Sequence, residues 1–111
     1  IGKNWSIKVG KNKTETIAIA YMQNVGLGRM ENVGAAYSLN VGAAMMTNVG
    51  MSKMTNVGMN YTITVGDTYT VKVGASILVM KSDGTITWNG KTIDLVAGEH
   101  MGLESERIDI N

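Results

Sequence analysis

The residues that could do chemistry are few, and most of them lie near the C-terminal end. His100 is the only histidine, and the absence of cysteine excludes thiolate ligands and thiol nucleophiles. One imidazole could bind a metal ion only if symmetry brought several copies together. In an extended chain His100 faces away from its apolar neighbour Met101, so we expect it to point outward. The sequence therefore predicts no metal site.

Carboxylates near this histidine raise the question of acid–base catalysis: Glu99, Glu104, Glu106 and Asp109. No partner motif accompanies them, and a solvated acidic face explains them. Gly26 and Gly28 lie close together, but no third Gly follows at the spacing of a phosphate-binding loop. We therefore predict that the chain is not an enzyme and binds no cofactor.

Composition excludes further classes of function. The 111 residues carry a net charge of +1, which gives no electrostatic case for nucleic-acid binding. No apolar run approaches the roughly 18 residues that a transmembrane helix needs. The sequence begins with Ile rather than Met, so we expect a piece of a longer protein.

A strict eight-residue repeat dominates the sequence. Ten octads cover residues 1–80, and we predict that residues 81–111 form distal coils with a changed consensus. The first position of the octad holds Ile1, Val9, Ile17, Val25, Val33, Val41, Val49, Val57, Val65 and Val73. The second position holds Gly2, Gly10, Gly26, Gly34, Gly42, Gly50, Gly58, Gly66 and Gly74, with Ala18 as the one exception.

This repeat predicts strands rather than helices. A helix requires apolar spacings of three and four, and a Gly in each octad would cost a helix about 1 kcal/mol each time. Val, Ile, Thr and Tyr recur instead, as strands prefer. We expect the chain to bend sharply, or to approach another backbone, at each repeated Gly.

The charges of the octads suggest which side chains face inward. The fourth and sixth positions carry no charge, whereas charges occur at the third, fifth, seventh and eighth positions. We therefore predict that the first, fourth and sixth positions face inward, with a second kink near the Asn that ends five of the octads. Four methionines at the sixth position are then interior: Met22, Met30, Met46 and Met54.

One chain is not expected to fold alone. Ordering eight residues costs on the order of 8–16 kcal/mol of backbone entropy, whereas burying one Val returns about 1.5–3 kcal/mol. Either one chain coils on itself, or three chains wind round a common axis with one octad on each face. Three-fold symmetry explains why all octads are alike, so the sequence favours three chains.

The repeated tripeptides resemble a known family. They include Asn40-Val41-Gly42, Asn48-Val49-Gly50, Asn56-Val57-Gly58, Thr64-Val65-Gly66 and Lys72-Val73-Gly74. The pattern resembles the valine–glycine repeat (VgrG) spike proteins of the type VI secretion system, and is similar to the needles of contractile phage tail spikes. The resemblance implies an all-β fold, a homotrimeric, intertwined triple-stranded β-helix or β-prism of octapeptide repeats.

The same resemblance implies a function. The trimer would be a structural, membrane-puncturing needle that is assembled in the bacterial cytoplasm and driven into a target cell envelope. Its partners would be a PAAR-repeat tip protein at the distal end, secreted effectors and, transiently, the target membrane.

Two other interpretations compete with the needle. In one, the chain is a phage or bacteriocin tail-fibre module whose aromatic residues, including Tyr37 and Tyr61, bind surface polysaccharide. In the other, the chain is a monomeric solenoid enzyme acting on polysaccharide. The enzyme would need paired carboxylates on its repeat face, and residues 1–80 contain only Glu15, Glu31 and Asp67.

Overall fold

The computed structural model of the chain describes residues 2–111. These residues form strands, bends and turns and contain no helix, so the predicted all-β class is confirmed. No part of this range offers a helix that could cross a membrane. The chain divides into two compact units, Ile1–Asn48 and Val49–Asn111, which are treated separately below.

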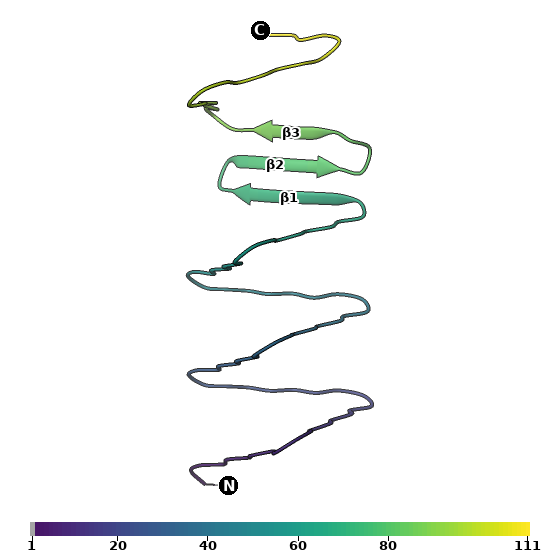
Figure 1. Cartoon of the computed structure of the whole chain (residues 1–111), viewed down its shortest axis with the longest axis vertical. Coiled ribbons are helices and arrows are strands. Elements are labelled where there is room, and N and C mark those ends of the chain that lie inside the picture. The colour runs from purple at the N-terminus through teal and green to yellow at the C-terminus, as the bar shows by residue number, and fades with distance from the viewer. Residues whose placement is uncertain (1) are drawn as a thin grey trace. The chain divides into compact units, whose positions relative to one another are not determined.

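The first unit consists of extended segments joined by sharp bends. The bends lie at residues 10–11, 18–19, 26–27, 34–35 and 42–43, which are always the second and third positions of an octad. Between bends the chain runs nearly straight (Figure 1). Each octad of this unit therefore contributes one straight segment and one corner.

The second unit continues this pattern and then changes to a sheet. Bends recur at residues 50–51, 58–59 and 66–67. Three strands follow: β1 (Thr68–Val73), β2 (Ser76–Lys81) and β3 (Ile86–Asn89). They form an antiparallel sheet in the order β1-β2-β3, as Figure 1 shows. The last octads thus pair within their own chain, whereas the earlier octads do not.

Glycine shapes both turns of this sheet. Gly74 and Ala75 join β1 to β2, and Gly74 has a φ of 54° while Ala75 has no positive φ. A type II′ hairpin requires this combination. Between β2 and β3, Gly84 has a φ of 92° and its N–H donates to the carbonyl of Lys81 at 3.1 Å. The Thr85 N–H donates to Oδ1 of Asp83 at 2.9 Å and fixes the same turn.

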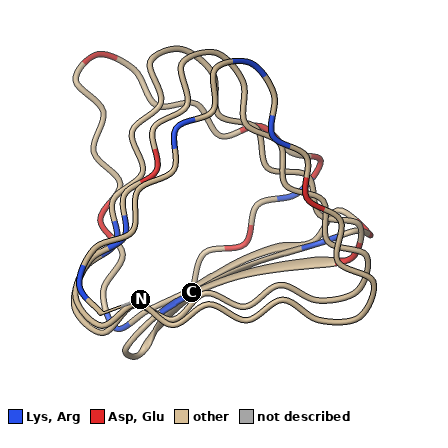
Figure 2. Ribbon diagram, turned by 90° about the horizontal axis from the view of Figure 1, so that it is seen from below, with Lys and Arg blue, Asp and Glu red and all other residues tan. Residues whose placement is uncertain are grey.

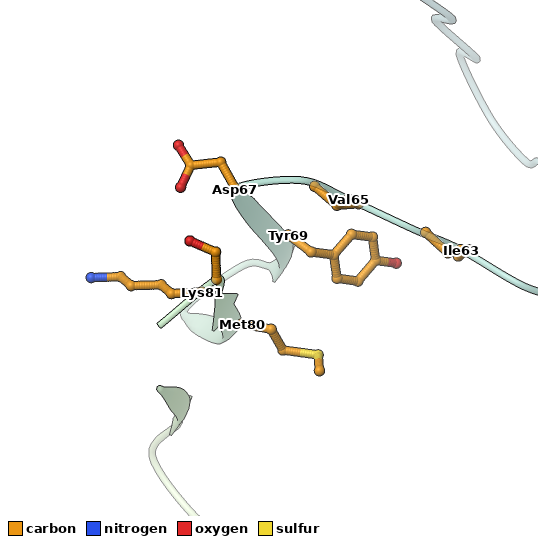
Figure 3. Close-up of a pocket in the computed structure, with 7 residues that line it drawn as sticks. Ile63, Val65, Asp67, Tyr69, Met80 and Lys81 are labelled. Carbon is orange, nitrogen blue, oxygen red and sulfur yellow. The ribbon is translucent and has the colours of Figure 1, made fainter. Parts of the chain in front are cut away.

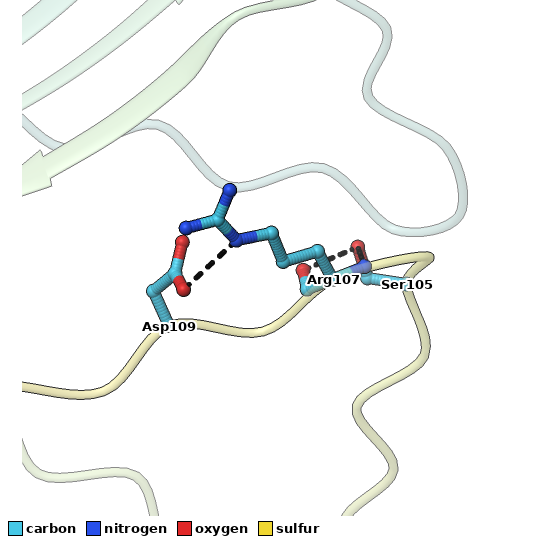
Figure 4. Close-up of polar contacts among 3 residues, drawn as sticks. All are labelled: Ser105, Arg107 and Asp109. Atoms are coloured by element: carbon cyan, nitrogen blue, oxygen red, sulfur yellow. Dashed lines mark hydrogen bonds and ion pairs between the residues drawn. The ribbon is translucent and has the colours of Figure 1, made fainter.

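After β3 the chain returns to extended segments with bends at 91, 98–99 and 106. The last bend has no Gly and is stabilised by a side chain instead. The Ser105 hydroxyl donates to the carbonyl of Arg107 at 2.8 Å, and the Arg107 N–H lies 3.3 Å from the same Oγ (Figure 4). Such Ser-centred turns replace the backbone pairing that a bend interrupts.

The single chain has no hydrophobic core. Among the described residues, no side chain, apolar or polar, is buried. The accessible surface is 12329 Å², whereas a compact monomer of this mass exposes about 6,000 Å² and an unfolded chain about 17,000 Å². The chain therefore removes roughly 30% of its surface from water, less than half of what a stable domain of this size removes.

Candidate assembly surface

Each octad has two faces because its side chains alternate along an extended segment. The bend at the second and third positions is the one bend in each octad from residue 10 to residue 67. From the fourth position to the next first position the alternation is therefore uninterrupted. We call the fifth, seventh and following first positions the valine face, and the fourth, sixth and eighth positions the methionine face.

Side-chain contacts support this assignment. On the valine face, Lys13 Nζ lies 3.5 Å from Oε2 of Glu15, so the fifth and seventh positions share a side. Arg29 and Glu31 repeat this contact at 3.6 Å two octads later. On the methionine face, Asn40 Nδ2 donates to Oγ of Ser38 at 3.5 Å, which joins the sixth and eighth positions.

The structure thus separates two sets of residues that the sequence predicted to lie together. The first-position residues Val9 to Val65 are 46–50% exposed, whereas the four sixth-position methionines are 81–86% exposed and lie on the opposite face. The prediction that both face inward needed a second kink near the Asn position, where the structure has no bend. Which of the two faces lies toward other chains stays a prediction, tested below.

The glycines of the octads require an explanation from outside the single chain. Gly10, Gly26 and Gly42 lie at bends, but Gly74 and Gly84 are the only described glycines with positive φ. A Cβ added at any second-position Gly would meet no atom within 4 Å. Apart from Gly74, neither a positive φ nor crowding within the chain explains the repeated Gly, which favours close approach by another backbone.

The backbone of the octads has hydrogen-bonding capacity that the chain does not use. Outside the ladder of the sheet, the backbone–backbone hydrogen bonds of the described residues all lie between residues 67 and 85. Residues 2–66 form extended segments without a paired strand. Because buried backbone donors and acceptors are almost always paired, burying these segments in an assembly would need strands from other chains.

Two cavities lie along the sheet in the second unit. The first, of about 240 Å³, joins Ile63 and Val65 of one extended segment to Tyr69 and Met80 of the sheet, with Asp67 and Lys81 on its polar side (Figure 3). The second, of about 350 Å³, includes Val71, Leu78, Trp88 and Ile93. The seventh position of one octad and the first position of the next therefore line one surface together with the sheet.

The residues that could do chemistry are not assembled into a site. The described part of the chain holds no group of three or more His, Asp or Glu side chains that could bind a metal ion. Glu99, Glu104 and Glu106 have no ion-pair partner among residues 2–111, whereas Asp109 pairs with Arg107 at 3.0 Å (Figure 4). Basic and acidic residues are interspersed along the chain (Figure 2).

Asp83, whose carboxylate has a shifted pKa, lies in the turn between β2 and β3. Two hydrogen bonds from Thr85, the first from its backbone N–H, lower the pKa of Asp83 below its usual value because they favour the charged form. Asp83 therefore has a structural explanation that requires no catalysis.

The predicted boundary between shaft and distal coils falls inside strand β2. The structure places an antiparallel sheet across residues 68–89, where the sequence predicted the last two octads of the shaft and the start of the distal coils. Sequence reasoning missed this sheet, although Asp83-Gly84 signals a turn and Thr70 to Val73 alternates as a strand does.

The comparisons with known proteins agree with an assembly role. No curated protein matches the sequence. Residues 1–80, more than two thirds of the chain, match the family model described as the bacteriophage T4 gp5 C-terminal trimerisation domain. The matched residues contain all the octads, and the all-β fold with repeated bends is the one expected of this β-helical domain. The chain therefore belongs to the family of the bacteriophage T4 gp5 C-terminal trimerisation domain.

Proposed function

We propose that the chain forms the rigid homotrimeric shaft of a spike in a type VI secretion apparatus, and that this shaft is driven through the envelope of a target cell. Family membership supports a homotrimer and a structural needle like that of a phage tail spike. The Val-Gly octads extend the proposal to the VgrG proteins, which combine such a needle with a contractile sheath.

One observation carries the proposal: the octads are extended, repeated and unpaired within their own chain. Residues 2–66 have their bends in register with the octads and no strand partner in the single chain. Three such chains wound together supply each segment with a strand on either side. A ladder closed in this way has few free edges and resists bending, which suits a part that transmits force.

The proposed role is mechanical rather than catalytic. The described residues hold no group of three or more His, Asp or Glu side chains that could bind a metal ion, and the sequence carries no nucleotide-binding motif. The force therefore comes from the apparatus to which the shaft is attached. We propose that the trimer assembles in the bacterial cytoplasm and delivers a PAAR-repeat tip protein and effectors.

A polysaccharide-binding tail fibre is the weaker alternative. The aromatic residues that would bind sugar, Tyr37 and Tyr61, are at the fifth position and thus on the valine face. If this face packs against the other chains, neither ring is available to a glycan.

Two measurements test the proposal. Multi-angle light scattering should give about 36 kDa, three times the chain mass of 11.9 kDa; a folded species of one chain mass would refute the trimer. In a producing bacterium, the tagged chain should reach target cells only when the contractile sheath is intact. Equal delivery from a strain without the sheath would refute the secretion role and leave the trimer unaffected.

A further inference from the structure

The sheet of the second unit has one apolar face and one polar face. In the antiparallel register, Tyr69 lies opposite Met80 and Val71 opposite Leu78, while Leu78 and Met80 lie opposite Trp88 and Ile86. Paired residues share a face, so these six residues form one apolar surface, which we call the sheet's apolar face. The other face includes Thr68, Thr70, Lys72, Lys81, Thr87 and Asn89, together with Ile77 and Val79.

The apolar face is open to solvent in the single chain. Ile86 and Trp88 are 60% and 57% exposed, and the rest of the face is at most partly covered. Exposed apolar surface of this extent on one side of a sheet is characteristic of an interaction site. The polar opposite face is suited to remain in contact with water.

The apolar face is continuous with the valine face of the octads. The three β1 residues Tyr69, Val71 and Val73 occupy the fifth, seventh and first positions of the repeat. Val65, the first-position residue of the octad that contains Tyr69 and Val71, lines the same cavity as Tyr69 and Met80 (Figure 3). Strand β1 and most of β2 also fall within the residues that match the trimerisation family. These observations identify two further copies of this chain as the occupants of the apolar face.

The sheet and the octads differ in how well they can fix the register between the three chains. In the octads, strands from different chains must pair, and the repeated Asn-Val-Gly tripeptides would allow one chain to slip by eight residues with little change in contacts. In the sheet, the strands pair within one chain, and large residues such as Trp88 occur once in the region. Three copies of the sheet's apolar face therefore fit together in one register of the three chains.

We propose that the apolar face of the β1-β2-β3 sheet packs against the same face in two other copies, and that this contact sets the register of the octads. The inference rests on the homotrimer and is independent of any role in secretion. The hairpin contacts are local, so the sheet forms early and presents its apolar face before the non-local octad pairing is complete.

A matched pair of variants of the full chain tests the contact. Leu78 and Val79 are adjacent, apolar and similarly exposed, but lie on opposite faces of β2. Leu78→Asp should abolish the trimer in light scattering, whereas Val79→Asp should keep it, because its carboxylate remains in water. Trimers of both variants with equal melting temperatures would overturn the proposal, as would loss of the trimer in both.

A milder variant tests the register directly. The chain has no cysteine, so Ser52→Cys provides one spin-labelling site per chain. Double electron–electron resonance on this trimer should give one narrow distance. Adding Leu78→Ala and Trp88→Ala should produce additional distances from slipped trimers, and the opposite-face control Val79→Ala should not. A single unchanged distance in the double-alanine trimer would overturn the register-setting role.

Discussion

Replacing Val41 by Asp distinguishes the two faces of the octad. Val41 is 49% exposed in the single chain, so about half of its surface is left for other chains to cover. Complete burial of a Val is worth about 1.5–3 kcal/mol, so the remaining half contributes about 0.7–1.5 kcal/mol per chain and about 2–4.5 kcal/mol per trimer. An Asp at this position forfeits that contribution and adds a desolvation penalty of several kcal/mol for each carboxylate.

The control lies in the same octad. Met46→Asp places the same carboxylate on the methionine face, where Met46 is 85% exposed. If the valine face lies toward the other chains, Val41→Asp should dissociate the trimer at neutral pH and Met46→Asp should leave it intact. Light scattering measures the mass, and circular dichroism during heating measures the melting temperature.

The pH dependence gives a second readout. A carboxylate at a buried site has a raised pKa, so its neutral form is the one the trimer tolerates. The Val41→Asp trimer should therefore be recovered as the pH falls below about 4, the unperturbed Asp value, and be lost as the pH rises. A stable Val41→Asp trimer together with a dissociated Met46→Asp variant would refute our choice of the valine face.

Two further predictions concern the turns of the sheet. Gly74→Ala forces a side chain into a φ of 54° and should destabilise each chain by about 1–2 kcal/mol, lowering the melting temperature, whereas Gly74→Asn should recover part of the loss. The lowered pKa of Asp83 stabilises the β2–β3 turn above the unfolded Asp pKa, and this stabilisation is lost as the pH falls through the folded value. Hydrogen exchange at the Thr85 amide should be slower in the wild type than in Asp83→Asn at neutral pH, and the two rates should converge in acid. A rate ratio that does not change with pH would contradict this role of Asp83. An unchanged melting temperature in Gly74→Ala would contradict the role of Gly74.

The repeat made much of the fold predictable. A period of eight with Val and Gly in adjacent positions indicated extended segments joined by regular bends, and the all-β fold confirms the class. The bends coincide with the second and third positions of the octad, where the sequence predicted them. The need for other chains also follows from the sequence, since one Val per octad cannot offset the entropy of ordering eight residues.

Two features escaped sequence reasoning, for identifiable reasons. The Val-Gly period continues through Val73 and Gly74, so the repeat conceals the change from unpaired segments to a hairpin, which depends on the positive φ of Gly74. The first position was predicted to face inward because it holds only Val or Ile, and the fourth and sixth positions because they carry no charge. Lys13 and Glu15 form an ion pair on the valine face, so charge alone does not separate the fifth and seventh positions from the first.

The change in pairing at residue 68 has a mechanical consequence for the trimer. In the proposed intertwined trimer, the strands of each chain before this residue would lie between strands of its companions, so tension applied lengthwise to one chain would be shared by rows of bonds that must break together. From β1 to β3 the bonds link a chain to itself, so each copy carries a folded unit wider than a single strand after residue 67. Lengthwise withdrawal of one chain therefore requires that unit to unravel first, and the trimer resists unthreading even where its repeats are nearly identical.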